Sequence, residues 1–178
     1  MSLDGFVAGP EGQLDWMSTE VDDKQVQLLQ ELTDSMDTII LGRKMAAESI
    51  PYWEKVAKTG PDSPEKKYAE TFVSTPKIVF SKTIKRIEGK NILVENGHLT
   101  ESINKIKSQK GKDIIVYGGA NFVNELINYN LIDELNLFIV PTAIGNGLKI
   151  FSKRTNFQFI KSISFSNGVI GTQYKKTE

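Results

Sequence analysis

The chain reads, from residue 114 to residue 122, Ile114-Ile115-Val116-Tyr117-Gly118-Gly119-Ala120-Asn121-Phe122. The apolar, largely β-branched first half of this stretch predicts a short buried strand over residues 113–117. The two glycines can adopt the positive φ angles of a tight turn, and helical periodicity follows over residues 121–129. We therefore expect a strand, a glycine turn and a helix to follow one another here.

Two other predicted strand ends carry a similar pattern. A β-branched run predicts a strand over residues 38–41, which ends at Gly42-Arg43-Lys44 before a helix through about Ser49. A further strand is expected over residues 77–80, and Ser81-Lys82-Thr83 follows it. Ligands of open α/β sheets bind at the carboxyl ends of the strands. The three turns are therefore candidate ligand-binding turns.

The remaining helical periodicity is found in two places. Helices are expected over residues 21–35 and 99–110, and Ser18 or Thr19 is the expected N-cap of the first. Pro51 and the glycine and prolines that follow it are expected to break up the next stretch, because proline removes a helical hydrogen bond.

Strand patterns complete the outline of the fold. They cover residues 91–95, 135–140, 157–166 and 169–175. Asn167-Gly168 joins the last two strands and predicts a two-residue hairpin turn in which both residues have positive φ angles. The order of elements predicts one domain over residues 1–178, an α/β three-layer sandwich. It would have a central mixed sheet, helices on both faces and a C-terminal antiparallel hairpin.

Composition narrows the classes of partner. The chain has 178 residues, 39% of them hydrophobic, which is enough to bury a core. Its 22 basic and 22 acidic residues cancel, so the sequence has no electrostatic footprint for nucleic acid or an anionic membrane. It contains no cysteine and one histidine, so we expect no metal site. We expect a cytoplasmic protein, because cysteine is absent and no apolar run reaches the ~18 residues of a membrane helix.

Each of the three turns suits a phosphate group. Helix N-termini present unpaired N–H groups and a partial positive charge, and glycine lets the backbone approach a ligand closely. Arg43 and Lys82 add full positive charges, while Ser81 and Thr83 add hydroxyl donors. One such turn is weak evidence, but three in order favour a dinucleotide ligand.

The order of motifs resembles the dihydrofolate-reductase-like superfamily, and most closely its riboflavin-biosynthesis reductase branch (RibD C-terminal domain-like). Four stretches carry the resemblance: Ser2-Leu3-Asp4-Gly5-Phe6-Val7-Ala8; Leu41-Gly42-Arg43-Lys44; Tyr117–Phe122; and Leu131–Leu135 continued by Pro141, Gly145, Gly147 and Phe151. The resemblance implies an NADPH-dependent reductase of a small heterocyclic substrate. That substrate would be similar to dihydrofolate or a pterin, or to 5-amino-6-(5-phosphoribosylamino)uracil.

The resemblance also implies cofactor contacts. Gly42, Arg43 and Lys44 match the turn at the cofactor phosphates, and Ser81 and Lys82 match the site that selects the 2′-phosphate of NADPH. The residues that match the pyrophosphate turn are Gly118, Gly119, Ala120, Asn121 and Phe122. Val7 and Ala8 match the backbone that lies beside the nicotinamide. The loop over residues 9–16 corresponds to a mobile lid that excludes water.

The chain departs from the family pattern at three places. Folate reductases carry an acid that faces the pterin, whereas the equivalent region here, near Gln25 and Val26, has no carboxylate. This difference weighs against folate reduction. Met45 stands where many relatives have threonine. Relatives also have a strand before the segment that begins at Ser2, and we expect either a late translation start or a misassigned gene start.

Several single residues have two interpretations. Asp4 is a candidate proton donor or substrate anchor, and equally a turn carboxylate that caps backbone N–H groups. Trp16 and Trp53 are candidate walls of the substrate pocket, and one of them is expected in the core. His98 follows a turn signal and is expected in an exposed loop. Asp133-Glu134 is expected to start a strand or to contact a partner subunit.

Two classes of function stay open. The first is a reductase, in which NADPH delivers hydride and Asp4 or water supplies the proton. The second is a non-catalytic, nucleotide-binding dimeric protein of the same fold. A homodimer is expected, with its contact near residues 133–151, and the expected ligand is a small molecule rather than nucleic acid or a membrane.

Overall fold

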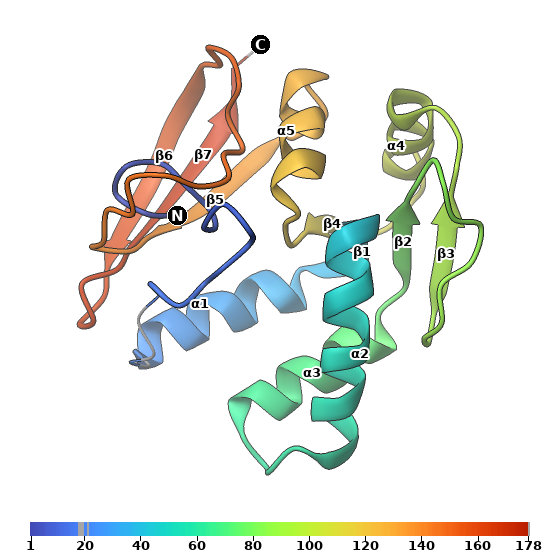
Figure 1. Ribbon diagram of the computed structural model, residues 1–178, viewed down its shortest axis with the longest axis horizontal. Coiled ribbons are helices and arrows are strands. Elements are labelled where there is room, and N and C mark those ends of the chain that lie inside the picture. The colour runs from blue at the N-terminus through green and yellow to red at the C-terminus, as the bar shows by residue number, and fades with distance from the viewer. Residues whose placement is uncertain (18–19, 21, 178) are drawn as a thin grey trace. The chain divides into compact units, whose positions relative to one another are not determined.

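The computed structural model describes residues 1–17, 20 and 22–177. The chain forms two compact units, one from residues 1–27 and 120–178 and the other from residues 28–119. We call them the antiparallel-sheet unit and the parallel-sheet unit, after the sheet that each contains (Figure 1). The prediction of one domain over the whole chain stays a prediction.

The parallel-sheet unit contains four strands in the order β3-β2-β1-β4, all parallel. Its elements are β1 (Met36–Gly42), α2 (Arg43–Thr59), α3 (Pro64–Ser74), β2 (Lys77–Phe80), β3 (Ile92–Glu95), α4 (Leu99–Lys107) and β4 (Asp113–Val116). Helices join β1 to β2 and β3 to β4, as parallel pairing requires, because a short turn cannot bring a strand back in the same direction.

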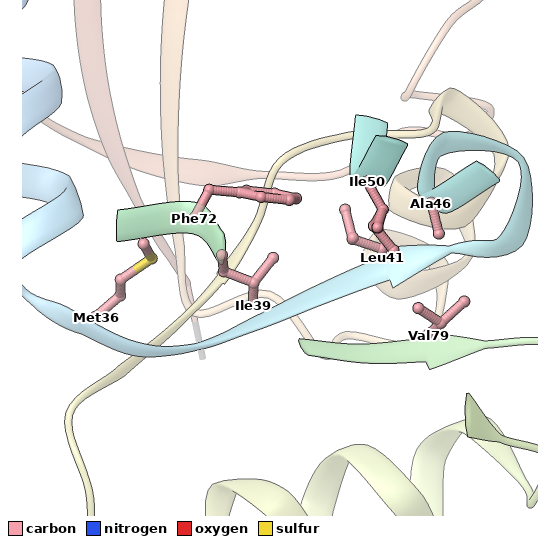
Figure 2. Close-up of a cluster of buried hydrophobic side chains, with 7 residues drawn as sticks. All are labelled: Met36, Ile39, Leu41, Ala46, Ile50, Phe72 and Val79. Carbon is pink, nitrogen blue, oxygen red and sulfur yellow. The ribbon is translucent and has the colours of Figure 1, made fainter. Parts of the chain in front are cut away.

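The core of this unit lies between the sheet and α2 and α3. Alternate residues of a strand face the same side, so Ile39 and Leu41 point together, and neither is exposed to solvent. Figure 2 shows Leu41 and Ile50 of α2 turned toward one another, with Phe72 of α3 nearby. The remaining members of the cluster are Met36, Ala46 and Val79.

Helix α2 continues to Thr59, so the expectation that Pro51 breaks this stretch was wrong. Proline at this position leaves the carbonyl of Ala47 without its helical N–H partner. Ala47 is exposed, so water can bind that carbonyl. Ile50 beside the proline is fully buried, and its packing holds the helix together across the defect.

Lys77, the first residue of β2, is only 2% exposed. Its Nζ donates hydrogen bonds to the carbonyl oxygens of Phe72 (2.8 Å), Val73 (3.1 Å) and Thr75 (2.7 Å) at the end of α3. The last carbonyls of a helix have no intrahelical partner, so the ammonium group caps them. Burial lowers the pKa of Lys77 to about 8.

Among its described residues, the antiparallel-sheet unit contains three strands in the order β5-β7-β6. Its elements are α5 (Ala120–Asn128), β5 (Glu134–Ile139), β6 (Phe157–Ser164) and β7 (Ile170–Lys176). α1 (Asp23–Asp34) contributes residues to both units. The start of the chain joins this sheet region, because the Met1 ammonium group donates to the Phe138 carbonyl at 2.6 Å and the Val140 N–H donates to the Met1 carbonyl at 2.8 Å.

The loop between β6 and β7 differs from the expected two-residue turn. Gly168 has a φ of +80°, but Asn167 is not among the residues with positive φ. The Gly168 N–H donates to the Phe165 carbonyl (3.1 Å), and the Phe165 N–H donates to the Val169 carbonyl (2.9 Å). The hairpin therefore has a three-residue loop that ends in a left-handed glycine.

The predicted α/β class is confirmed, with helices, a parallel sheet and an antiparallel hairpin. The expected single mixed sheet is replaced, among the described residues, by two separate sheets. At the start of α1, the predicted caps Ser18 and Thr19 lie outside the described residues. Asp22 accepts a hydrogen bond from the Gln25 N–H there at 3.0 Å.

Candidate functional site

The carboxyl ends of the parallel strands bring three predicted turns to one edge of the parallel sheet. The register pairs Gly42 of β1 with Phe80 of β2, and Phe80 with Glu95 of β3. On the other side of β1, Val116 of β4 pairs with Ile40. The segments that follow these strands therefore leave the sheet on the same side, as the sequence predicted.

The first turn is the start of α2. Gly42 is its N-cap in extended conformation, no side chain caps the helix, and the first helical turn holds no acidic residue. The first N–H groups of this 17-residue helix therefore have no partner in the helix. Arg43 and Lys44 are exposed, and the described residues offer neither side chain an ion pair. This end of α2 combines free donors with two positive charges, which favours an anion.

The second turn follows β2. The Oγ of Ser81 accepts hydrogen bonds from the N–H groups of Thr83 and Ile84, both at 3.1 Å. The amide nitrogen of Asn96 donates to the carbonyls of Ser81 (2.6 Å) and Ile84 (2.8 Å). Lys82 is exposed between these anchored residues. The loop over residues 81–84 is thus closed on itself and presents a cation.

The third turn is Gly118-Gly119. Gly118 has a φ of +128° and Gly119 a φ of +85°, which L side chains rarely adopt. A Cβ added to Gly118 would lie 3.1 Å from the Cε of Met45. Met45, which stands in place of the family threonine, therefore extends its methyl group toward this turn.

The other implied cofactor residues belong to the antiparallel-sheet unit. The Val7 N–H donates to the Leu148 carbonyl at 2.8 Å, and the Leu148 N–H donates to the Ala8 carbonyl at 2.9 Å. Val7 and Ala8 are thus held as extended backbone against the segment around Leu148. The other three residues open α5 and are Ala120, Asn121 and Phe122.

Asp4 has the contacts expected of a capping carboxylate. It accepts hydrogen bonds from the Ser2 hydroxyl (2.7 Å) and from the N–H groups of Ile144 (3.2 Å) and Gly145 (2.7 Å). These bonds, with that of Ser2 first, lower its pKa. An ionised carboxylate has no proton to donate, so the contacts favour the capping interpretation. A catalytic role for Asp4 stays a prediction.

The two tryptophans differ in their surroundings. Trp53 packs against the core cluster of the parallel-sheet unit, with ring centroids 4.8 Å from Tyr52 and 4.7 Å from Tyr68. Trp53 is therefore the tryptophan expected in the core, and its contact with substrate stays a prediction. Trp16 is half-buried in the predicted lid, where its ring N–H donates to the Gln13 carbonyl at 3.1 Å. Its contact with substrate stays a prediction.

Sequence reasoning missed a polar link centred on Asp22. Asp22 is 8% exposed, and its carboxylate accepts hydrogen bonds from the N–H (2.7 Å) and the hydroxyl (2.6 Å) of Ser166. These bonds lower the pKa of Asp22 to about 2. Asn167 donates to the side chain of Gln25 at 2.9 Å beside it. The link joins the start of α1 to the β6–β7 loop, and its only signal in the sequence is an acidic residue near the start of a predicted helix.

The remaining candidates have structural positions. His98 is exposed and precedes α4, as expected. Glu134 opens β5 and accepts a hydrogen bond from Gln173 of β7, which confirms the strand-start interpretation of Asp133-Glu134. The described part of the chain holds no cluster of three or more histidine, cysteine or acidic residues that could bind a metal ion. Within the described residues, no helix is both long enough and apolar enough to cross a membrane.

An α/β fold whose parallel strands end in glycine turns and a helix start is typical of nucleotide-binding proteins, and comparisons with known proteins identify the family. The sequence matches the RibD C-terminal domain family over residues 1–170. The chain therefore belongs to the RibD C-terminal domain family, and this membership supports a reductase function.

The chain is similar to one sequence relative and to two solved structures of the same fold. The uncharacterized protein YyaP of Bacillus subtilis (strain 168) is 34% identical over 178 residues, covering 98% of this chain and 90% of YyaP. The crystal structure of a putative riboflavin biosynthesis protein from Shewanella sp. PV-4 has a TM-score of 0.72 and 23% identity, covering 100% of this chain and 96% of that one. Dihydrofolate reductase from Enterococcus faecalis, complexed with NADP(H) and RAB-propyl, has a TM-score of 0.62 and 15% identity, covering 100% and 93%.

Proposed function

We propose that this protein is an NADPH-dependent reductase that transfers hydride to a small heterocyclic substrate. The observation that carries the proposal is the edge of the parallel sheet, where the uncapped start of α2, the closed loop over residues 81–84 and the Gly118-Gly119 turn follow neighbouring strands. Each feature favours a phosphate group. The complex of the Enterococcus dihydrofolate reductase with NADP(H) supports the same class of cofactor.

The preference for NADPH over NADH is part of the proposal. NADPH differs from NADH by the 2′-phosphate, so residues that bind it should carry positive charge. Arg43 and Lys82 are exposed cations that follow the adjacent strands β1 and β2. Neither side chain is engaged by an acidic residue in the described structure, so both are available to a phosphate group.

The proposed substrate is an aminopyrimidine such as 5-amino-6-(5-phosphoribosylamino)uracil, or a pterin such as dihydrofolate. Family membership and the similarity to a putative riboflavin biosynthesis protein favour the aminopyrimidine. The absence of a carboxylate near Gln25 weighs against the pterin. We place the activity in the cytoplasm, which suits a chain without cysteine.

The cofactor proposal can be tested by titrating the protein with NADPH and with NADH while recording tryptophan fluorescence. We expect NADPH to bind well below roughly millimolar concentration. Arg43→Ala and Lys82→Ala should each raise the dissociation constant of NADPH by about tenfold to a hundredfold, because a hydrogen bond to a charged group contributes about 1.5–3 kcal/mol. The dissociation constant of NADH should change much less.

Lys58→Ala is the matched control, because Lys58 lies in the last turn of the same helix α2. It should leave both dissociation constants unchanged. Equal weakening of NADPH and NADH by Arg43→Ala and Lys82→Ala would contradict the role of these residues at the 2′-phosphate. Oxidation of NADPH should then be assayed with the ribosylaminopyrimidine and with dihydrofolate. Binding without turnover of either would favour the non-catalytic alternative.

We also propose that the protein is a homodimer, with the end strand β6 as a candidate contact in addition to residues 133–151. β6 is the end strand of its sheet, and its Phe159 (56% exposed) and Ile160 (46% exposed) are apolar. An edge strand of this kind favours antiparallel pairing with a second copy. Sedimentation equilibrium should give twice the chain mass, and Ile160→Lys should yield a monomer. A monomeric wild-type protein would overturn this proposal.

A further inference from the structure

Asn96 follows directly after β3, and its side chain reaches across to the loop after β2. Both hydrogens of its amide group are used there, in hydrogen bonds to the carbonyl oxygens of Ser81 at 2.6 Å and Ile84 at 2.8 Å. We propose that Asn96 is a positioning residue that holds the loop over residues 81–84 in its anion-binding conformation. The inference rests on the proposed function, because it assigns that loop to the 2′-phosphate of NADPH.

The chemistry of the bridge suits this role. Carbonyl oxygens carry partial negative charge, and an anion-binding loop must turn them away from the anion. The amide of Asn96 draws two carbonyls of the loop toward itself at once. An amide has two donor hydrogens, whereas a hydroxyl has one and a carboxylate has none. Among short side chains, asparagine is therefore well suited to bind both carbonyls.

Other hydrogen bonds hold the rest of the loop, two from within it and one from β3. Ser81 Oγ accepts hydrogen bonds from the N–H groups of Thr83 and Ile84, and the Ser81 N–H donates to the Glu95 carbonyl at 3.1 Å. The Ser81 and Thr83 hydroxyl oxygens lie 3.4 Å apart, so one of the two hydroxyls can turn its hydrogen to a phosphate oxygen while the other bridges them. Holding the loop in this form before binding avoids the entropic cost of ordering it around the ligand. The bond to Glu95 holds only the first residue of the loop, whereas Asn96 also binds Ile84 at the loop's far end.

Asn91 offers a matched control at the other end of β3. Its amide nitrogen also donates to two carbonyls, those of Ser74 (2.8 Å) and Val73 (3.4 Å), but at the amino end of the strand. Its φ is +56°, a conformation that glycine adopts readily. Asn91→Gly thus removes a similar bridge far along β3 from the proposed phosphate loop, without adding backbone strain.

The experiment measures the dissociation constants of NADPH and NADH for the full-length wild-type protein and three variants. We expect Asn96→Ala to raise the dissociation constant of NADPH about tenfold and that of NADH less than about threefold. Asn96→Asp should weaken NADPH further, because its charge repels both the loop carbonyls and the phosphate. Asn91→Gly should lower stability and leave the NADPH-to-NADH ratio unchanged.

A second measurement needs no cofactor. Amide hydrogen exchange at Thr83 and Ile84 should become faster in Asn96→Ala and stay unchanged in Asn91→Gly, since only the first variant opens the loop. Unchanged exchange, or an unchanged ratio of the two dissociation constants in Asn96→Ala, would overturn the role of Asn96 while leaving the proposed function intact. If wild-type protein binds NADPH no better than NADH, the 2′-phosphate assignment fails and this inference fails with it.

Discussion

A Gly118→Ala variant is expected to lose NADPH binding while it remains folded, with a dissociation constant raised at least about a hundredfold. Gly118 has a φ of +128°, which alanine adopts only with strain. The added Cβ would also lie 3.1 Å from Met45 Cε. The backbone must therefore leave its present conformation, and the N–H groups of the turn will no longer meet the phosphates. Fluorescence titration with NADPH measures the loss.

Gly168→Ala is the control for a strained backbone and a close Cβ contact at a turn outside the proposed cofactor site. Gly168 has a φ of +80° in the β6–β7 loop, and its added Cβ would lie 3.1 Å from the Cγ of Pro141. We expect this variant to lose about 1–2 kcal/mol of stability, the usual cost of left-handed backbone in an L residue, and to bind NADPH normally. Retention of affinity within about threefold in Gly118→Ala would show that this turn does not hold the cofactor.

A Lys77→Ala variant is expected to lose about 3 kcal/mol of unfolding free energy. The substitution removes the buried methylene stem and leaves the carbonyls of Phe72, Val73 and Thr75 without their shared donor. Lys77→Met keeps most of the stem, so its loss should be smaller. Urea denaturation measures both changes. The slope of unfolding free energy against urea concentration should be the same for the wild type and both variants. Lys110→Met, at an exposed position, should change stability by less than about 0.5 kcal/mol.

The stability contribution of Lys77 should also depend on pH. Burial lowers its pKa to about 8, below the unfolded value of 10.5. Between these pH values the unfolded chain holds a proton that the folded protein has released, so the free energy of unfolding rises with pH. The difference between wild type and Lys77→Met should therefore grow from pH 8 to 10.5. Burial also raises the pKa of Tyr68, but Tyr68 is present in both proteins and its effect cancels.

Most helices and strands could be predicted because their signals are local. The strand over residues 77–80 matches β2, and the strand predicted over residues 91–95 matches β3 within one residue. Alternation of apolar residues and the position of glycines specify such segments without reference to the rest of the chain. Pro51 misled this reasoning, because the packing of Ile50 stabilises a helix that local preference would end.

The candidate site was predictable to the same degree. The sequence shows the glycine pair Gly118-Gly119 and the cations that follow two strands. In the structure both glycines have positive φ angles, and the cations follow the ends of β1 and β2 as expected. The loop over residues 81–84 is different, because its shape depends on Asn96, which lies on another strand end. No spacing rule connects Asn96 with Ser81, since their contact follows from the parallel pairing of β2 and β3.

The sequence by itself indicated the α/β class and the turns that follow the strands. It also indicated a cation at two of those turns. These features follow from local conformational preference and charge. Tertiary structure decided the division into two sheets, the capping role of Asp4 and the burial of Lys77. Each of these depends on partners distant in sequence, or on how closely a helix end packs against a strand. Hydrogen bonds and burial of this kind are set by the folded arrangement of the backbone, which local periodicity does not specify.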